Sequence, residues 1–162
     1  MYWTDWGVNA KIERASMDGS DRRVLHNTGL AWPNGLTIDY PAQRIYWADA
    51  SQDVIEYSNI DGSGRFVLRS GLDHPFSITL EDDLLFWTDW VNNAIHATHK
   101  ISSIGFSDIY SNFRGSPFGV EAVTATRQVQ NCKCHKSSQI HSFCFHLKDY
   151  VSFLYCCSEK SM

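Results

Sequence analysis

Three features are scarce in this 162-residue sequence: positive charge, long apolar runs and, over most of its length, cysteine. The formal net charge is −4 and no segment forms a basic stripe, so the electrostatic attraction that nucleic-acid binding needs is missing. No apolar run reaches the roughly 18 residues of a membrane-spanning segment, so none is predicted. Met1 leads directly into a tryptophan-rich motif, so no secretory signal is predicted either.

The abundant residue types are distributed unevenly. All six tryptophans lie within the first ninety residues, and all five cysteines lie within the last thirty-one. Residues 1–130 carry ten Lys and Arg against sixteen Asp and Glu, whereas residues 131–162 carry four against two. Two compositions are therefore joined near residue 131. Because five is an odd number, complete disulfide pairing would leave one thiol over.

One four-residue motif returns at intervals of about forty residues. It occurs as Tyr2-Trp3-Thr4-Asp5, Tyr46-Trp47-Ala48-Asp49 and Phe86-Trp87-Thr88-Asp89. Further landmarks recur in the same order, such as Asp18-Gly19 with Asp61-Gly62, and Trp32-Pro33 with His74-Pro75. Ordered matches of this kind indicate an internal repeat.

Each repeat predicts four short β-strands. In the second repeat they are expected at 35–39, 44–49, 53–59 and 64–69; in the third, strands are expected at 94–98 and 108–112, and a further strand starts at 116–120. Asp61-Gly62 falls between two of them, where a tight hairpin needs φ > 0 and glycine carries no steric penalty. Four strands per repeat of this length are the signature of a β-propeller blade, which buries both faces only by stacking on neighbours.

These motifs resemble the YWTD, or class B, repeats of the low-density-lipoprotein receptor family, whose propellers have six blades. The predicted fold class is therefore all-β, a partial YWTD propeller of about three four-stranded blades over residues 1–130. The resemblance implies an extracellular module that recognises protein ligands through its propeller face, with no enzymatic activity, no cofactor and no metal. It is nearest to receptor-related proteins of the endocytic or Wnt co-receptor type. A matrix-assembly propeller of nidogen type is the alternative.

The resemblance also assigns structural roles to the motif residues. The aromatic side chains are expected to pack between blades, where they supply much of the buried apolar area. The aspartates are expected to bond backbone groups and tie neighbouring blades together. The residues concerned are Tyr2, Trp3, Asp5, Tyr46, Trp47, Asp49, Phe86, Trp87 and Asp89.

His74 has two interpretations. In receptors of the family, a histidine in a matching His-Pro-Phe-Ser context helps to release ligand at endosomal pH, which makes His74 a candidate pH switch. Its partner histidine one blade earlier corresponds to Ile55 here, however, and His74 can equally be a turn residue leading into the strand at Pro75. Exposed ligand contacts are predicted at Tyr57, Glu81 and Trp90.

Residues 131–162 depart from the family. An EGF-like module is expected after the propeller in the full parent protein, but none is recognisable here, and no glycine follows Gly119. Three cysteines and three histidines at 132–146 have a spacing that fits no common zinc module, so no metal site is predicted. The segment is predicted to be a non-homologous, cysteine-rich tail that is irregular or disordered.

The repeat region is too short for a complete six-bladed ring. Six blades of 40–45 residues need about 250 residues, so residues 1–130 correspond to about half a ring. We therefore expect a fragment or truncated isoform from the extracellular ectodomain of a membrane receptor.

Overall fold

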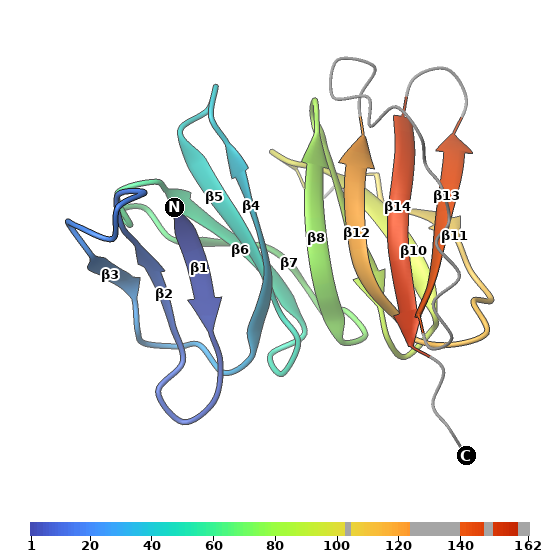
Figure 1. Cartoon of the computed structure of the whole chain (residues 1–162), viewed down its shortest axis with the longest axis horizontal. Helices are drawn as coiled ribbons and strands as arrows, with labels where there is room; N and C mark the ends of the chain where they lie inside the picture. Colours follow the sequence, from blue (N-terminus) through green and yellow to red (C-terminus); the bar gives the residue numbers. More distant parts are fainter. Residues whose placement is uncertain (103–104, 124–139, 148–150, 159–162) are drawn as a thin grey trace.

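The computed structural model describes residues 1–102, 105–123, 140–147 and 151–158. Within these ranges the chain forms antiparallel β-strands, and no helix is long and apolar enough to cross a membrane. The strands make four sheets that follow one another along the chain, coloured from blue to red in Figure 1.

The first sheet has the order β1-β2-β3, with β1 at Tyr2–Asp5, β2 at Lys11–Arg14 and β3 at Arg23–His26. The second has the order β4-β5-β6-β7, formed by Pro33–Asp39, Arg44–Asp49, Val54–Asn59 and Phe66–Ser70. The third has the order β8-β9-β10-β11, formed by Pro75–Glu81, Leu84–Asp89, Ala94–His99 and Ser107–Tyr110. The fourth has the order β12-β14-β13, formed by Pro117–Val123, Val151–Ser158 and Ile140–Leu147.

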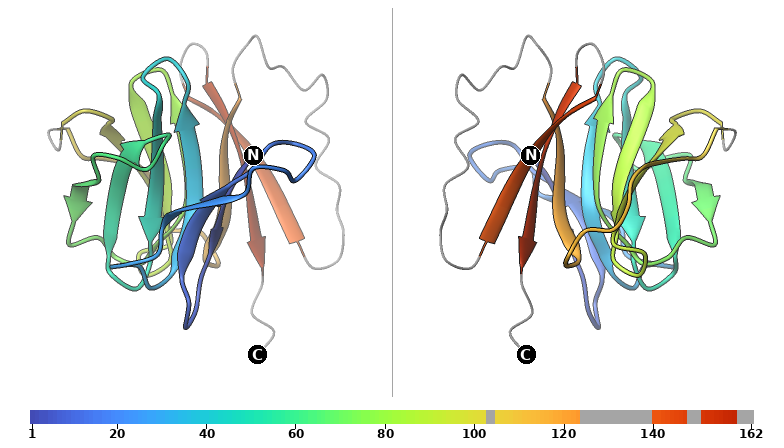
Figure 2. Two further views of the ribbon diagram at one scale, coloured as in Figure 1. Left: turned by 90° about the vertical axis from the view of Figure 1, so that its left-hand side faces the viewer. Right: turned by 90° about the vertical axis from the view of Figure 1, so that its right-hand side faces the viewer.

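This arrangement confirms the predicted all-β blade pattern. The strands expected in the second repeat correspond to β4 to β7, with each boundary within two residues of its expected position. The Tyr-Trp-Thr-Asp motif and its two variants form β1, β5 and β9, so β1 is the counterpart of the second strand in the four-stranded sheets. The first strands β4, β8 and β12 lie side by side, with β1 next to β4 (Figures 1 and 2).

The motif strands of the second and third sheets, β5 and β9, are buried on both faces. Successive side chains of a strand point to opposite faces. In β5, Ile45 and Trp47 pack with Ile12 of the first sheet, whereas Tyr46 and Ala48 pack towards the third sheet. The motif strand can therefore be apolar on both faces only because a sheet lies on each side of it.

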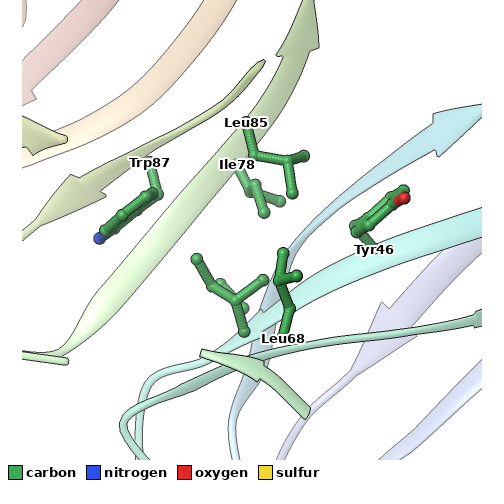
Figure 3. Packing of buried hydrophobic residues seen from close by; sticks show 7 residues of the cluster. Tyr46, Leu68, Ile78, Leu85 and Trp87 are labelled. Carbon is green, nitrogen blue, oxygen red and sulfur yellow. The ribbon is translucent and has the colours of Figure 1, made fainter. Parts of the chain in front are cut away.

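The third sheet repeats this division. Leu85 and Trp87 of β9 face the second sheet, where Figure 3 shows them with Tyr46 and Leu68. Phe86, the residue between them, packs with Ile95, Phe113, Val120 and Ala122 towards the fourth sheet. Three apolar clusters thus join four sheets in a row.

The structure corrects the prediction of an irregular or disordered tail. Ile140–Leu147 and Val151–Ser158 form a hairpin whose second strand pairs antiparallel with β12. Each segment contains two aromatic residues of the Phe and Tyr type and one β-branched residue, which favour strands, and β12 offers unpaired backbone groups at its edge. The predicted domain boundary after residue 130 lies outside the described residues. Cys132, Cys134 and His135, three of the residues considered for zinc, also lie outside the described residues.

A partly buried ion pair of the second sheet also holds the linker that precedes this sheet. The Arg65 guanidinium makes a two-pronged bond to Glu56, with Nη2 and Nε 2.6 and 3.0 Å from the carboxylate oxygens. It lies 5.4 Å from the centre of the Trp47 ring, and the Trp47 Nε1–H donates to Glu56 at 3.2 Å. The same guanidinium also donates to the carbonyls of Thr28 and Gly29, in the linker between the two sheets. Arg65 therefore fixes both its own sheet and the linker.

The first sheet carries the same arrangement on its outer face. Among the described residues, no other sheet packs on this face. Arg22 bonds the Glu13 carboxylate at 2.7 and 3.0 Å and lies 5.2 Å from the Trp3 ring. These bonds, with a second contact from Lys11, hold the pKa of Glu13 to about 2 although burial opposes this. Both pairs therefore join a buried carboxylate to a guanidinium beside a motif tryptophan.

The close approach of β4 and β8 requires glycine at position 35. A Cβ atom on Gly35 would lie 2.6 Å from the Ile78 nitrogen and 2.8 Å from the Phe76 oxygen, which are backbone atoms that cannot move aside. We expect Gly35→Ala to lower the free energy of unfolding by about 1–3 kcal/mol, measured by urea unfolding followed by tryptophan fluorescence. The control is Gly119→Ala at the equivalent position of β12, where a Cβ meets nothing within 4 Å. Equal losses in the two variants would contradict the steric explanation.

The ion pair of the second sheet gives a further expectation. Arg65→Met leaves the Glu56 carboxylate buried without its partner, so we expect a loss of about 3–5 kcal/mol. Arg22→Met should cost far less, because Arg22 is 58% exposed and Glu13 keeps Lys11. The same urea experiment measures both. A loss for Arg65→Met no larger than for Arg22→Met would show that burial does not govern this pair.

Candidate ligand-binding surface

Aromatic rings gather at one end of the sheets. This is the end where β1, β5 and β9 finish and where β4, β8 and β12 begin, on the lower side of Figure 1. Six rings from the four sheets meet there, which we call the aromatic strip: Trp6, Trp32, His74, Phe76, Trp90 and Phe118.

The repeat places these rings next to one another. Trp32 and His74 both immediately precede the first proline of an inner strand, and Trp6 and Trp90 both immediately follow a motif aspartate. Equivalent positions of stacked sheets lie side by side, so the rings line up across the sheets.

The rings form a continuous series of contacts. Trp6 and Trp32 have their ring centres 6.4 Å apart, Trp32 and His74 5.9 Å, and His74 and Trp90 5.5 Å. Trp90 stacks on Phe76 at 4.0 Å and meets Phe118 edge-on at 4.6 Å. Such geometries are favourable for aromatic pairs, so the rings hold one another in place.

The strip is both exposed and anchored. Trp6 is 64% exposed, Trp32 43% and Phe118 37%, which is unusual for side chains of this size. The Trp90 indole N–H donates to the Pro117 carbonyl at 2.8 Å, and the Trp32 backbone N–H donates to Asp49 at 3.0 Å. Trp6 and Phe118 also line a hollow of about 310 Å³ between the sheets.

The motif aspartates anchor the backbone beneath the strip. Asp49 is fully buried and accepts N–H bonds from Ala31 and Trp32 of the linker, as well as from Ser51 and Gln52. These bonds join the linker between two sheets to the end of β5. The rings that follow are therefore mounted on a fixed backbone.

Asp89 is buried but has different partners. It accepts the N–H groups of Val91 and Asn92, the Asn92 side-chain amide and a contact from His96 Nε2 at 3.0 Å. Asp5 is exposed. Trp3 is half-buried beneath Arg22, whereas Trp47 and Trp87 are fully covered.

Two of the residues singled out in the sequence lie in the strip. His74 sits between Trp32 and Trp90, in a left-handed backbone conformation with φ 54°, and its N–H donates to Asp53 at 3.1 Å. Trp90 contacts three other rings of the strip.

The other two predicted contacts lie elsewhere. Tyr57 is half-buried on β6 between Tyr46 and Phe66, under the Arg44 guanidinium. Glu81 ends β8, at the opposite end of the sheet from the strip. The structure thus separates Tyr57 and Glu81 from Trp90.

Sequence reasoning missed four strip residues, Trp6, Trp32, Phe76 and Phe118. The signal was present in the repeat, since Phe76 and Phe118 both directly follow the first proline of an inner strand. Among the described residues, no group of three or more His, Cys, Asp or Glu side chains could hold a metal ion.

Comparison with known proteins gives the repeat its family. Residues 1–40 and 43–80 match the low-density lipoprotein receptor repeat class B. The chain is 44% identical over 103 residues to the vitellogenin receptor Yl of Drosophila melanogaster, covering 63% of this chain and 5% of the receptor. It is 42% identical over 103 residues to the human low-density lipoprotein receptor-related protein 5-like protein, covering 63% of this chain and 41% of that protein.

A solved structure resembles this chain in both fold and sequence. The chain superposes on a structure of the nidogen/laminin complex with a TM-score of 0.66 and 34% identity, over 74% of this chain and 46% of that one. The chain therefore spans less than half the length of each of these proteins. The repeated motif, the stacked sheets and these matches together show that this chain carries low-density lipoprotein receptor class B (YWTD) repeats, arranged as part of a β-propeller.

Proposed function

We propose that this chain is a recognition module for a protein ligand and that the aromatic strip is the docking surface. The observation that carries the proposal is the exposure of Trp6, Trp32 and Phe118 within one continuous series of rings. Exposed apolar groups of this size, gathered rather than scattered, are typical of protein interaction sites. Tryptophan in particular is enriched among residues that dominate binding energy.

The geometry suits such a role in two ways. The rings are held by mutual contacts and by the buried Asp49 frame, so little side-chain entropy is lost when a ligand covers them. The hollow beside Trp6 and Phe118 offers a place for an apolar side chain of the ligand. The strip therefore supports recognition of a segment that carries exposed apolar residues.

The class of parent protein follows from the relatives. A receptor is favoured because the vitellogenin receptor and the receptor-related protein 5-like protein share this repeat. We propose an endocytic or Wnt co-receptor type of receptor that displays the propeller outside the cell, and no enzymatic role. In that parent, residues 1–130 form part of the ring, residues 131–162 are a non-homologous tail, and an EGF-like module belongs beside the complete propeller.

The docking surface can be tested without knowing the ligand. A phage-displayed library of random linear peptides is selected on the immobilised full chain, and the enriched peptides are synthesised. We expect their affinity to fall at least tenfold for Trp6→Ala and for Trp32→Ala, because each change removes a large exposed ring. Fluorescence anisotropy of labelled peptides measures the affinities.

Tyr40→Ala is the matched control, because Tyr40 is also 64% exposed but lies in the turn after β4, away from the strip. Peptides that bind both tryptophan variants as tightly as the parent chain would overturn the proposal. So would peptides that lose affinity only for Tyr40→Ala.

A matrix-assembly role of nidogen type is the second candidate. It is favoured by the 34% identity to the nidogen chain in a complex with laminin. If this role is correct, surface plasmon resonance should detect binding of purified laminin to the immobilised full chain, and Trp32→Ala should abolish it. Absence of laminin binding by a chain that does bind selected peptides would leave the receptor assignment and exclude this one.

A further inference from the structure

The third sheet lacks the ion pair that the first two sheets share. Glu13 pairs in register with Trp3, Glu56 with Trp47, and His96 with Trp87. Alignment of the repeats places Phe106, after Gly105, where Arg65 follows Gly64. His96 and Phe106 therefore occupy the positions of a glutamate and an arginine.

Part of the space that a guanidinium fills in the second sheet is open in the third, beside the Phe106 ring, which lies 5.7 Å from the Trp87 ring. A Cβ on Gly29 would lie 3.7 Å from both terminal nitrogens of Arg65, whereas a Cβ on the equivalent Gly71 would meet nothing within 4 Å. A cavity of about 70 Å³ occupies this place, which we call the arginine slot. Its lining includes Gly71, Asp73, Trp87, Asp89 and Phe106.

The lining is chemically matched to a cation. The carboxylates of Asp73 and Asp89 are joined through the side-chain amide of Asn92, which donates to both at 2.9 and 2.8 Å. Trp87 and Phe106 contribute ring surfaces 5.7 Å apart between centres, and rings of this kind attract a planar guanidinium.

Two basic residues lie at the slot, His96 as one of its lining residues and Arg69 beside it. Both nitrogens of the His96 ring are taken, by Asp89 at 3.0 Å and by Asp108 at 2.8 Å. The Arg69 guanidinium lies 5.2 Å from the Phe106 ring centre and 3.5 Å from the Thr98 hydroxyl, and Arg69 is not among the residues that line the slot.

We propose that the arginine slot receives the guanidinium of an arginine side chain carried by a protein ligand. Arg65 shows within the same chain that this place in a sheet accepts a guanidinium, between a motif tryptophan, a carboxylate and two linker carbonyls. The slot adjoins the strip, since Asp73 precedes His74. The inference rests on the proposed function only in that a protein ligand supplies the arginine.

The test uses N-methylguanidinium as the probe. It is titrated into the full chain while nuclear magnetic resonance follows the indole N–H signal of Trp87. We expect a saturable shift in the millimolar range, and none with methylurea, which has a similar shape but no charge. Asp73→Asn should weaken binding about tenfold, whereas Asp83→Asn, at the far end of the sheet, should leave it unchanged.

Phe106→Arg provides the decisive variant, because it places a guanidinium in the slot from within the chain. We expect it to abolish the saturable shift, while Phe106→Leu, which also removes the ring, retains binding within a few-fold. Equal shifts with methylurea would show that the slot holds only water or neutral molecules and would overturn the proposal. So would undiminished binding by a folded Phe106→Arg variant. Peptide binding at the strip is measured separately, so either proposal can fail alone.

Discussion

The structure depends on burying the motif strands of the second and third sheets on both of their faces. The motif strand of the second sheet sends Trp47 to one neighbour and Tyr46 to the other, and both side chains are fully buried. A single antiparallel sheet in water can hide only one face, so such a strand is stable only inside a stack. The roughly forty-residue repeat, the clusters and the order of the sheets all follow from this requirement.

Stacking also explains why a binding surface arises at the sheet ends. The forces that align the sheets bring equivalent positions of consecutive repeats together, and the linkers are tied down by buried groups such as Asp49 and Arg65. The six residues of the aromatic strip take no part in the three apolar clusters. Rings placed at the sheet ends, such as Trp6 and Trp32, remain exposed while standing on a rigid base.

The sequence was informative wherever a local pattern repeats. Strand positions in the second and third repeats followed from the repeated motif and the Asp61-Gly62 turn. Each of these signals lies within a few consecutive residues, so it can be recognised in the sequence. The tail hairpin was missed because its pairing with β12 is long-range and no repeat announces it. The strip was found only at His74 and Trp90, since exposure and ring contacts between sheets require the register of two sheets at once.

The third repeat differs from the first two in the groups beside its motif tryptophan. A buried carboxylate beside the motif tryptophan needs a partner, and in the first two sheets an arginine of the same sheet provides it. The third sheet replaces both groups without leaving a buried charge alone, because His96 is held by Asp89 and Asp108. Because the buried polar groups of the third sheet are paired in this other way, the space that an arginine fills in the other sheets is no longer needed for stability. It can then serve a ligand that supplies the missing group.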